Sequence, residues 1–547
     1  MPEKASTLAK VACRAQIGLH APLVHVEVSL GPGLPAFTIV GLPATVVKES
    51  KERVRAALIN SDFEFPAGHI TVNLAPADVP KEGGRFDLPI ALGILLASGQ
   101  ITASSGSETT EFYGELGLGG ELKPVRGLLL AAARAAQWGH ELVVPCKNAE
   151  EARLASKAPV RAANHLLEVC AHVTRKSPLP NYISRNAQQT ATSNAQTHSP
   201  DLSDVRGQLH AKRALVIAAA GGHSLLMIGP PGSGKSMLAQ RLPGLLPELS
   251  TAESIEVASI ASAGGMGFDQ RSYGRRPFRT PHHTASAAAL VGGGRRARPG
   301  EASLAHHGVL FLDELPEFAR ATLEALREPL ETGAVSVSRA AARAQYPAAF
   351  QLVAAMNPCP CGHRGDPAVY CPCTPGEVQR YRAKISGPLL DRIDMHVEVP
   401  RVEVKEFEAS IDCGESPENP WTSTSTAAAR VRDARRRQLA RQGICNARLA
   451  DAQVDHWCRP DASGRRVLAR SMQCFGLSAR GRGRILKLAR TIADLDGDDT
   501  ITAPHVSQAV IFRCLDRSTD AGGMGSGSAI PDAEGSGAAA PDPALIT

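Results

Sequence analysis

Apolar and polar residues alternate along the first third of the chain in two different rhythms. Val24–Leu30 and His69–Leu74 alternate with a period of two, which is typical of strands that bury one face. Lys48–Asn60 and Leu88–Ser98 are longer stretches with the spacing of helices. We therefore predict an α/β domain over residues 1–172.

Three short apolar runs in the middle of the chain end in polar residues. They are Ser224–Ile228, Gly308–Leu312 and Phe350–Met356, and their length and composition predict buried strands. These runs indicate a second α/β module over residues 204–411. A helical, arginine-rich region is expected after it, over residues 427–516.

Polar and small residues separate and follow these regions. Residues 173–203 are rich in Asn, Gln, Ser and Thr, especially from 178 to 200, and cannot bury a core. We expect a flexible linker there and a shorter Ser/Thr/Pro linker over residues 412–426. The Gly/Ala/Ser/Pro-rich tail, residues 517–547, is predicted to be disordered.

Composition narrows the class of protein. Aromatic residues make up only 4% of the 547 residues, which weakens any proposal based on base stacking, and the net charge of +6 is modest. Most of the twelve cysteines are scattered without a signal peptide, which indicates reduced thiols. No apolar run approaches the roughly 20 residues of a membrane span. We expect a cytoplasmic protein with no membrane partner.

The first apolar run leads into a glycine-rich loop and then a helix, the context of a P-loop. Backbone N–H groups of such a loop curl around phosphate oxygens, Lys235 would reach the β- and γ-phosphates, and Ser236 would bind Mg²⁺. The alternative is a glycine-rich turn with a chance Lys-Ser. The predicted ATP-binding residues are Gly229, Pro230, Pro231, Gly232, Ser233, Gly234, Lys235 and Ser236.

The second apolar run ends in Asp313 and Glu314, which is the pattern of a Walker B strand. Asp313 would hold the magnesium shell, and Glu314 would polarise the water that attacks the terminal phosphate. The alternative is that the two carboxylates only cap the next helix. With the P-loop, this pair predicts an ATP-hydrolysing enzyme.

Longer stretches resemble a known family. Arg276–Gly294, Glu301–Phe318 and Gln351–Gly362 together resemble the magnesium-chelatase-like AAA+ family, and more closely its competence-associated ComM/YifB branch. Phe37–Leu58 and Val72–Leu92 resemble the Lon-like, ribosomal-S5-type domain of the same family. The resemblance covers nearly the whole chain apart from the linker and the tail. It implies an AAA+ P-loop core with a helical lid, preceded by a Lon-like α/β domain.

The resemblance also assigns roles to three further residues. Asn357 would be sensor 1, which orients the attacking water; a plain strand-end cap is the alternative. Arg480 resembles a sensor 2 arginine of the lid, whereas a solvated helix face is the rival interpretation for Arg482 and Arg484.

Arg392 resembles the arginine finger that reaches into a neighbouring subunit's site and stabilises transition-state charge. A finger contributed in this way implies a ring, most often a homo-hexamer. The alternative is a local ion pair of Arg392 with Asp391 and Asp394.

The family resemblance implies a hexameric, ATP-driven DNA helicase that promotes branch migration when DNA taken up by the cell is integrated during natural transformation. Recombination proteins would be further partners. A second hypothesis is a chelatase-like motor that remodels a partner protein complex. A Lon-type protease fits poorly, because the PKEGG stretch at Pro80–Gly84 is followed by Arg85 instead of a nucleophilic Ser.

Arginine clusters suggest where DNA would bind. Seven Arg and no acid lie between Arg271 and Arg298, where the family places a helix-2 insert, and Val335–Ala348 reads as a presensor-1 hairpin. Such residues would neutralise phosphates without reading bases; a solvated or intersubunit face is the alternative. For the basic helix Ala429–Gly443 that alternative is favoured. The candidate DNA contacts are Arg295, Arg296, Arg339 and Arg343.

Four cysteines are clustered in one short loop after the third apolar run, in the pattern C-x-C…C-x-C. Four thiolates can bind Zn²⁺ tetrahedrally. Free thiols or a redox pair are the alternative, and His363 is a lesser candidate ligand. The candidate zinc ligands are Cys359, Cys361, Cys371 and Cys373.

Overall fold

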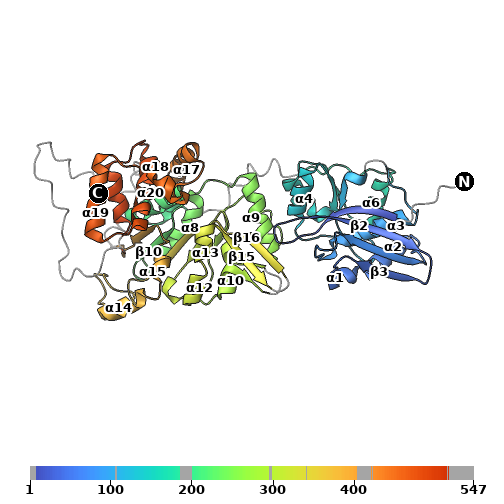
Figure 1. Cartoon of the computed structure of the whole chain (residues 1–547), viewed down its shortest axis with the longest axis horizontal. Coiled ribbons are helices and arrows are strands. Elements are labelled where there is room, and N and C mark those ends of the chain that lie inside the picture. The colour runs from blue at the N-terminus through green and yellow to red at the C-terminus, as the bar shows by residue number, and fades with distance from the viewer. Residues whose placement is uncertain are drawn as a thin grey trace, which may run out of the picture.

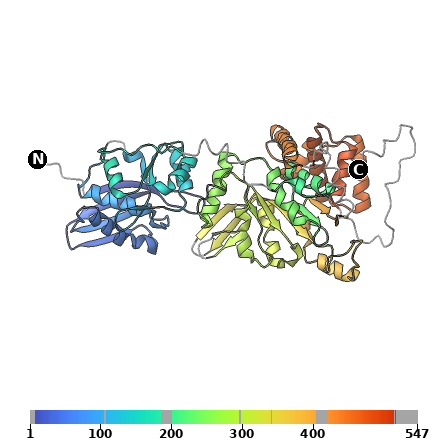
Figure 2. The same cartoon turned by 180° about the vertical axis from the view of Figure 1, so that it is seen from behind.

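The computed structural model describes residues 8–104, 107–184, 200–294, 298–339, 342–402, 421, 423–513 and 515. The molecule is elongated, with an N-terminal α/β domain at one end, a P-loop module in the middle and a helical domain at the other end (Figures 1 and 2). Among the helices in these ranges, none combines the length and the apolar character that crossing a membrane requires.

The N-terminal domain is built on a mixed seven-stranded sheet of order β3-β4-β2-β1-β5-β8-β9. The predicted strands and helices of this region are present, with ends shifted by one or two residues. Its strands are β1 (Leu8–Arg14), β2 (Leu23–Gly31), β3 (Ala36–Val40), β4 (His69–Ala75), β5 (Thr110–Phe112), β8 (Glu141–Pro145) and β9 (Val160–Ala163), with the small pair β6 (Glu115–Leu116) and β7 (Leu122–Lys123). Its helices are α1 (Thr45–Lys48), α2 (Ser50–Asn60), α3 (Asp87–Ala97), α4 (Leu128–Gln137), α5 (Ala149–Ala155) and α6 (Leu166–Val173).

Helix α3 forms the centre of this domain because it is apolar on all sides and packs on β1 and β2. A Cβ at Gly93 would lie 2.4 Å from a methyl group of Val28, so the missing side chain lets the helix approach the sheet closely. Arg85, just before α3, is buried and donates hydrogen bonds to the carbonyl oxygens of Arg126 and Arg14. Arg85 therefore has a structural role, because it joins two main-chain segments beneath α3.

The P-loop module has a five-stranded sheet of order β11-β14-β17-β10-β18, and every neighbouring pair is parallel. The strands are β10 (Leu225–Ile228), β11 (Phe278–Arg279), β14 (Val309–Leu312), β17 (Gln351–Met356) and β18 (Met395–Glu398). The helices are α7 (Leu209–Gly221), α8 (Lys235–Leu245), α9 (Thr251–Ala263), α10 (Ala287–Val291), α11 (Glu301–Leu304), α12 (Arg320–Glu324), α13 (Arg327–Thr332), α14 (Pro375–Arg382) and α15 (Gly387–Leu390). Since the strands are parallel, the three polar endings predicted from sequence lie at one edge of the sheet.

Two antiparallel hairpins extend this module. One pairs β12 (Gly292–Gly293) with β13 (Arg298–Pro299), and the other pairs β15 (Ala334–Arg339) with β16 (Ala342–Pro347). The β15–β16 pair confirms the hairpin predicted over Val335–Ala348. Strands β12 and β15 are in contact, so the two hairpins lie side by side. The candidate contacts Arg295 and Arg296 lie outside the described residues, and so do the side chains of Arg339 and Arg343.

The C-terminal domain consists of helices that pack on α7 and α8. They are α17 (Thr424–Gln442), α18 (Asp451–Trp457), α19 (Ala462–Phe475), α20 (Ala479–Asp496) and α21 (Ala503–Ile511). In the basic helix α17, Arg435 donates to the carbonyl of Ala219, and Arg441 pairs with the buried Asp494 at 2.7 Å. These two arginines therefore attach the helix to its neighbours.

The ends of the predicted linker over residues 173–203 carry ordered structure. Leu179 is buried, and the N–H of Tyr182 donates to the carbonyl of Val160 in β9. At the other end, Leu202 is buried in the core of the P-loop module. The prediction from polar composition therefore placed both ends of the linker too far into the neighbouring domains. A few apolar residues, such as Leu179 and Leu202, extend the packed cores into the polar stretch.

Candidate nucleotide-binding site

The loop after β10 has the backbone shape of a phosphate-binding loop. Gly232 and Gly234 adopt φ angles of 78° and 89°, which residues with a side chain rarely adopt. Helix α8 begins directly afterwards, at Lys235, so its first N–H groups have no partner within the helix. Together with the helix dipole, these N–H groups favour an anion at this position.

Lys235, at the start of α8, and Asn357, directly after β17, converge at this loop. The Lys235 ammonium donates to the carbonyls of Gly229 and Pro230, at 2.7 and 2.8 Å, and lies 3.4 Å from Oδ1 of Asn357. Burial lowers the pKa of Lys235, and the nearby acids Asp313 and Glu314 oppose that shift. The ammonium group therefore lies next to the position that the loop prepares for phosphate.

A hydroxyl and a carboxylate meet on the other side of the loop. The Ser236 hydroxyl donates to Oδ2 of Asp313 at 2.7 Å, and Oδ1 of Asp313 accepts the N–H of Glu314 at 2.9 Å. Such oxygens are the ligands that Mg²⁺ prefers beside a nucleoside triphosphate. In the loop itself, the buried hydroxyl of Ser233 has no hydrogen-bond partner within the described residues. The residues present therefore fit a magnesium nucleotide.

Glu314 has an unusual backbone conformation beside this pair of oxygens. Its φ and ψ of 51° and 48° are left-handed, a region that costs a residue with a side chain about 1–2 kcal/mol. Its carboxylate is half-exposed and lies 3.3 Å from Nδ1 of His283, which follows β11. In the sequence, His283 stands out only as a member of the arginine-rich segment. Spacing could not reveal this pair, because it forms across two neighbouring strands.

Comparisons with known protein families match three stretches of the chain. A family model described as magnesium chelatase, subunit ChlI, matches residues 201–407. Two further models, described as subunit ChlI of Mg-chelatase and as the ChlI C-terminal part, match residues 26–148 and 422–513.

Full-length relatives are also similar. The uncharacterized protein YifB of Escherichia coli is 48% identical over 512 residues, which span 93% of this chain and 98% of that protein. Competence protein ComM of Haemophilus influenzae is 46% identical over 511 residues, with the same two coverages. This chain belongs to the YifB/ComM family. It is a magnesium-chelatase-like AAA ATPase, and that class uses ATP with Mg²⁺.

Within this member of the family, Arg392 is held by contacts inside the chain. Its guanidinium pairs with Glu331 and donates to the carbonyl of Pro388 at 2.6 Å, and the side chain is only 12% exposed. The pairing with Asp391 and Asp394 that local sequence suggested is not the one observed. For Arg392 to act on a neighbouring subunit, it would have to leave the exposed carboxylate of Glu331.

Asp394 connects the sheet to the helical lid. Its carboxylate accepts the N–H of Ser224 at 3.1 Å and lies 3.5 Å from His223 and 3.4 Å from Arg484 of α20. Burial raises the pKa of Asp394, but these partners outweigh burial and hold the pKa at about 2. Arg480, the predicted sensor 2, is exposed and makes no hydrogen bond or ion pair with the part of the chain that the structure describes. Of the three α20 arginines Arg480, Arg482 and Arg484, it is therefore Arg484 that pairs with the P-loop module, whereas Arg482 pairs with Asp455.

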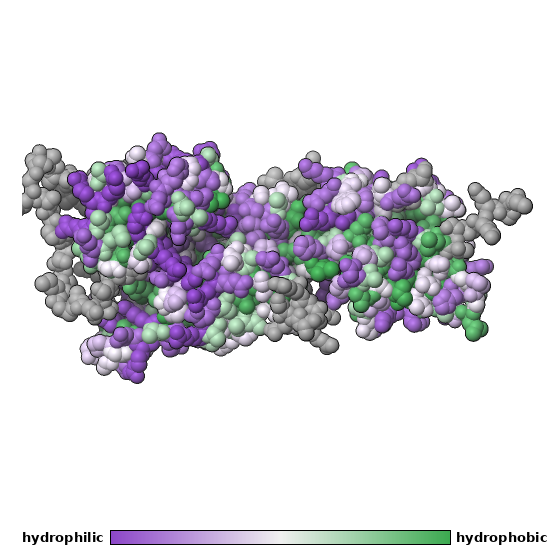
Figure 3. Space-filling model, viewed as in Figure 1, coloured by the Kyte–Doolittle hydropathy of each residue, from purple (hydrophilic) through white to green (hydrophobic). Residues whose placement is uncertain are grey.

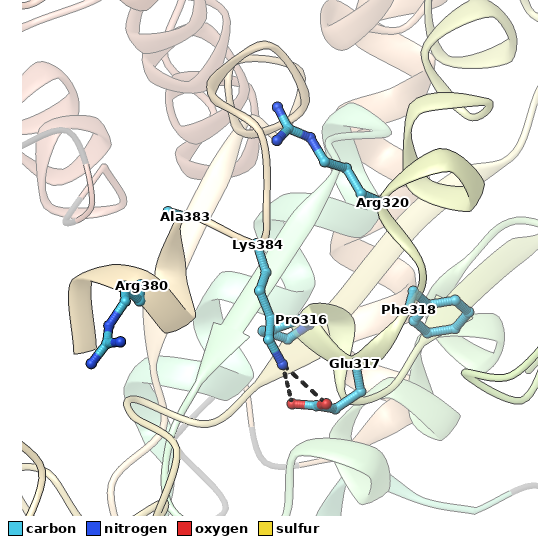
Figure 4. Close-up of a pocket in the computed structure, with 7 residues that line it drawn as sticks. All are labelled: Pro316, Glu317, Phe318, Arg320, Arg380, Ala383 and Lys384. Atoms are coloured by element: carbon cyan, nitrogen blue, oxygen red, sulfur yellow. Dashed lines mark hydrogen bonds and ion pairs between the residues drawn. The ribbon is translucent and has the colours of Figure 1, made fainter. Parts of the chain in front are cut away.

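A hollow of about 510 Å³ opens directly after the Walker B acids (Figure 4). Lys384 lies 3.2 Å from both oxygens of Glu317 across it, while Arg320 and Arg380 come from the helices α12 and α14. Three cations against one acid give this hollow a positive character. The sequence contained no signal for it, because its residues come from segments about sixty positions apart.

The four clustered cysteines are also brought together. The Sγ atoms of Cys359, Cys361, Cys371 and Cys373 all lie within 4.8 Å of one another, and all four are free thiols. The P-loop with Asp313 and Asn357 therefore forms one group of predicted site residues at this sheet edge, and the cysteine loop that follows Asn357 forms a second group.

Proposed function

We propose that this chain is a ring-forming, ATP-driven DNA motor that promotes branch migration of recombination intermediates during natural transformation. The observation that carries the proposal is the position of two adjoining arginine-bearing hairpins on the same module as the nucleotide site. The name of the Haemophilus influenzae relative, a competence protein, supports the choice of process.

The nucleotide site supplies the energy. The loop N–H groups and Lys235 would hold the β- and γ-phosphates, and a bound Mg²⁺ would be held by Ser236 and Asp313 and offset phosphate charge. Glu314 would accept the proton of the attacking water while Asn357 orients that water. His283, at 3.3 Å from Glu314, would act as a positioning residue that holds the carboxylate away from the water until the subunit is ready to hydrolyse ATP.

The hairpins would contact the DNA backbone. A Cβ at Gly292 would lie 3.2 Å from a methyl group of Val337, so the insert and the presensor hairpin form one surface. Two arginines of the insert are already used inside the protein: Arg276 donates to the carbonyls of Pro247 and His307, and Arg279 pairs with Glu301. The arginines nearer the ends of the hairpins would therefore make the contacts with DNA. Figure 3 shows that this face of the P-loop module and the lid is mostly hydrophilic.

We expect a movement of the presensor hairpin to be transmitted to the N-terminal domain. Its turn around Gly18 lies beside the presensor hairpin, because a Cβ at Gly18 would be 3.7 Å from the hydroxyl of Tyr346. Leu19 of the same turn packs against the core that contains Tyr346. We expect this domain to guide the substrate or help assemble the ring, not to cleave protein.

The DNA part of the proposal is tested by the ATPase rate with and without forked or four-way DNA at two salt concentrations. DNA should raise the rate, and a double variant of Arg339→Ala and Arg343→Ala should lose that stimulation. For each arginine that no longer neutralises a phosphate, the log–log salt slope of binding to single strands should fall by about 0.7. Arg436→Ala is the matched control, because Arg436 is an exposed lid arginine that pairs with Asp433.

The ring part is tested by mixing two inactive variants. Lys235→Ala lacks a working site but keeps Arg392, whereas Arg392→Ala keeps the site but lacks the finger. In randomly mixed rings about one quarter of the interfaces should combine an intact site with an intact finger and regain activity. If the mixture stays as inactive as its components, Arg392 does not act in trans.

A chelatase-like motor for a partner protein is the second candidate, and the match to the magnesium chelatase ChlI models favours it. Its ATPase rate would not respond to DNA, and no strand displacement would occur at either salt concentration. That outcome would replace the DNA proposal with this one.

A further inference from the structure

The cysteine loop has the dimensions of a metal site. Sγ of Cys359 lies 3.4 Å from Sγ of Cys361 and 3.6 Å from that of Cys371, and Cys361 and Cys371 are 3.5 Å apart. A tetrahedral zinc site with Zn–S bonds of about 2.3 Å places its sulfurs about 3.8 Å apart. A disulfide, with sulfurs about 2 Å apart, does not fit these distances.

The four sulfurs form one compact group. All four Sγ atoms lie within 4.8 Å of one another, so a single ion can reach each of them. We infer that Cys359, Cys361, Cys371 and Cys373 hold one structural Zn²⁺, which closes the loop and keeps it against the nucleotide site.

The surroundings of the loop suggest what the metal holds in place. Cys359 is fully buried two positions after Asn357, and Cys373 directly precedes Thr374, which caps α14. A Cβ at Gly362, inside the loop, would lie 2.7 Å from the ring of Pro231 in the P-loop. The loop therefore touches the phosphate-binding loop at one point and carries Asn357 at its start.

Helix α14 closes the arrangement from the other end. Tyr381 of α14 is buried in the same core as Met356, the residue directly before Asn357. Fixing both ends of the loop at one ion removes conformational freedom that the loop would otherwise keep. Loss of the ion should therefore release Asn357 from its place beside Lys235; this consequence, unlike the metal site itself, rests on the proposed ATPase chemistry.

The metal is tested first on the wild-type chain, purified without added metal, by elemental analysis and thiol titration. We expect one zinc per chain, released when a mercurial reagent modifies the thiols. A double variant of Cys371→Ser and Cys373→Ser should contain none, whereas Cys474→Ser, an exposed lid cysteine, should keep it. No metal, iron in place of zinc, or four thiols lost to disulfides in the wild type would overturn the assignment.

The consequence for Asn357 is tested on the same protein with a fluorescent ATP analogue and limited proteolysis. Zinc-free protein should bind the analogue several-fold more weakly and be cut within residues 358–374, while Cys474→Ser behaves as wild type. Unchanged affinity and unchanged cleavage would show that the ion does not hold the loop. Metal content is measured without ATP turnover, so the zinc site can stand or fall separately from the proposed motor.

Discussion

Gly229 is the position where a single methyl group should disturb the nucleotide site most directly. A Cβ there would lie 2.0 Å from the carbonyl oxygen of Val399 and 2.9 Å from the hydroxyl of Ser233. The N–H of Val399 is bonded to the carbonyl of Ile228 at 2.8 Å, so neither backbone can move without disturbing the pairing of β10 with the end of β18. In Gly229→Ala, the phosphate-binding loop has to shift.

The size of the effect follows from that overlap. Overpacking of this kind costs about 1–3 kcal/mol. If the loop shift is expressed in ATP binding, the same energy weakens affinity about 5- to 150-fold. Titration with a fluorescent ATP analogue and a thermal unfolding curve would measure how the loss divides between binding and stability.

Gly376→Ala is the matched control for this prediction. A Cβ at Gly376 meets nothing within 4 Å, and the residue lies in the first turn of α14. Alanine is favoured over glycine in helices by about 0.5–1 kcal/mol, so this variant should bind ATP normally and unfold no earlier than wild type. If Gly229→Ala also binds ATP and unfolds like wild type, the close packing of the loop on Val399 is refuted.

Three further predictions concern single residues. Glu314→Gln should bind ATP but lower turnover about 10²- to 10⁴-fold, measured as phosphate release. His283→Ala should change turnover by less than about fivefold, because a half-exposed pair contributes about 0–1 kcal/mol, and a rise without DNA would support a restraining role. Burial and then the charge of His307 lower the pKa of His306 to about 4, while Glu256 opposes this. As the pH falls below 6.5, His306 is protonated in the unfolded chain before it is protonated in the folded chain. The free energy of unfolding should therefore fall from pH 6.5 towards pH 4. His306→Gln should flatten the accompanying fall in melting temperature.

The chain's local patterns were sufficient to predict the phosphate-binding loop and most of the elements around it. Gly232 and Gly234 permit backbone angles that other residues avoid, and the apolar run before them can only be buried as a strand. The close spacing of Cys359 and Cys361, and of the second cysteine pair, likewise predicted convergence. Such features depend on residues within one loop, so their geometry follows from residue types and separations along the chain.

Pairings between distant segments were decided by the tertiary structure alone. Arg392 pairs with Glu331, His283 approaches Glu314, and Arg484 of the lid reaches Asp394. Each of these pairs depends on the order of parallel strands and on how helices pack across them, which no local pattern specifies. Charged side chains accept many partners at similar energy, so burial and strand order select the partner that is observed.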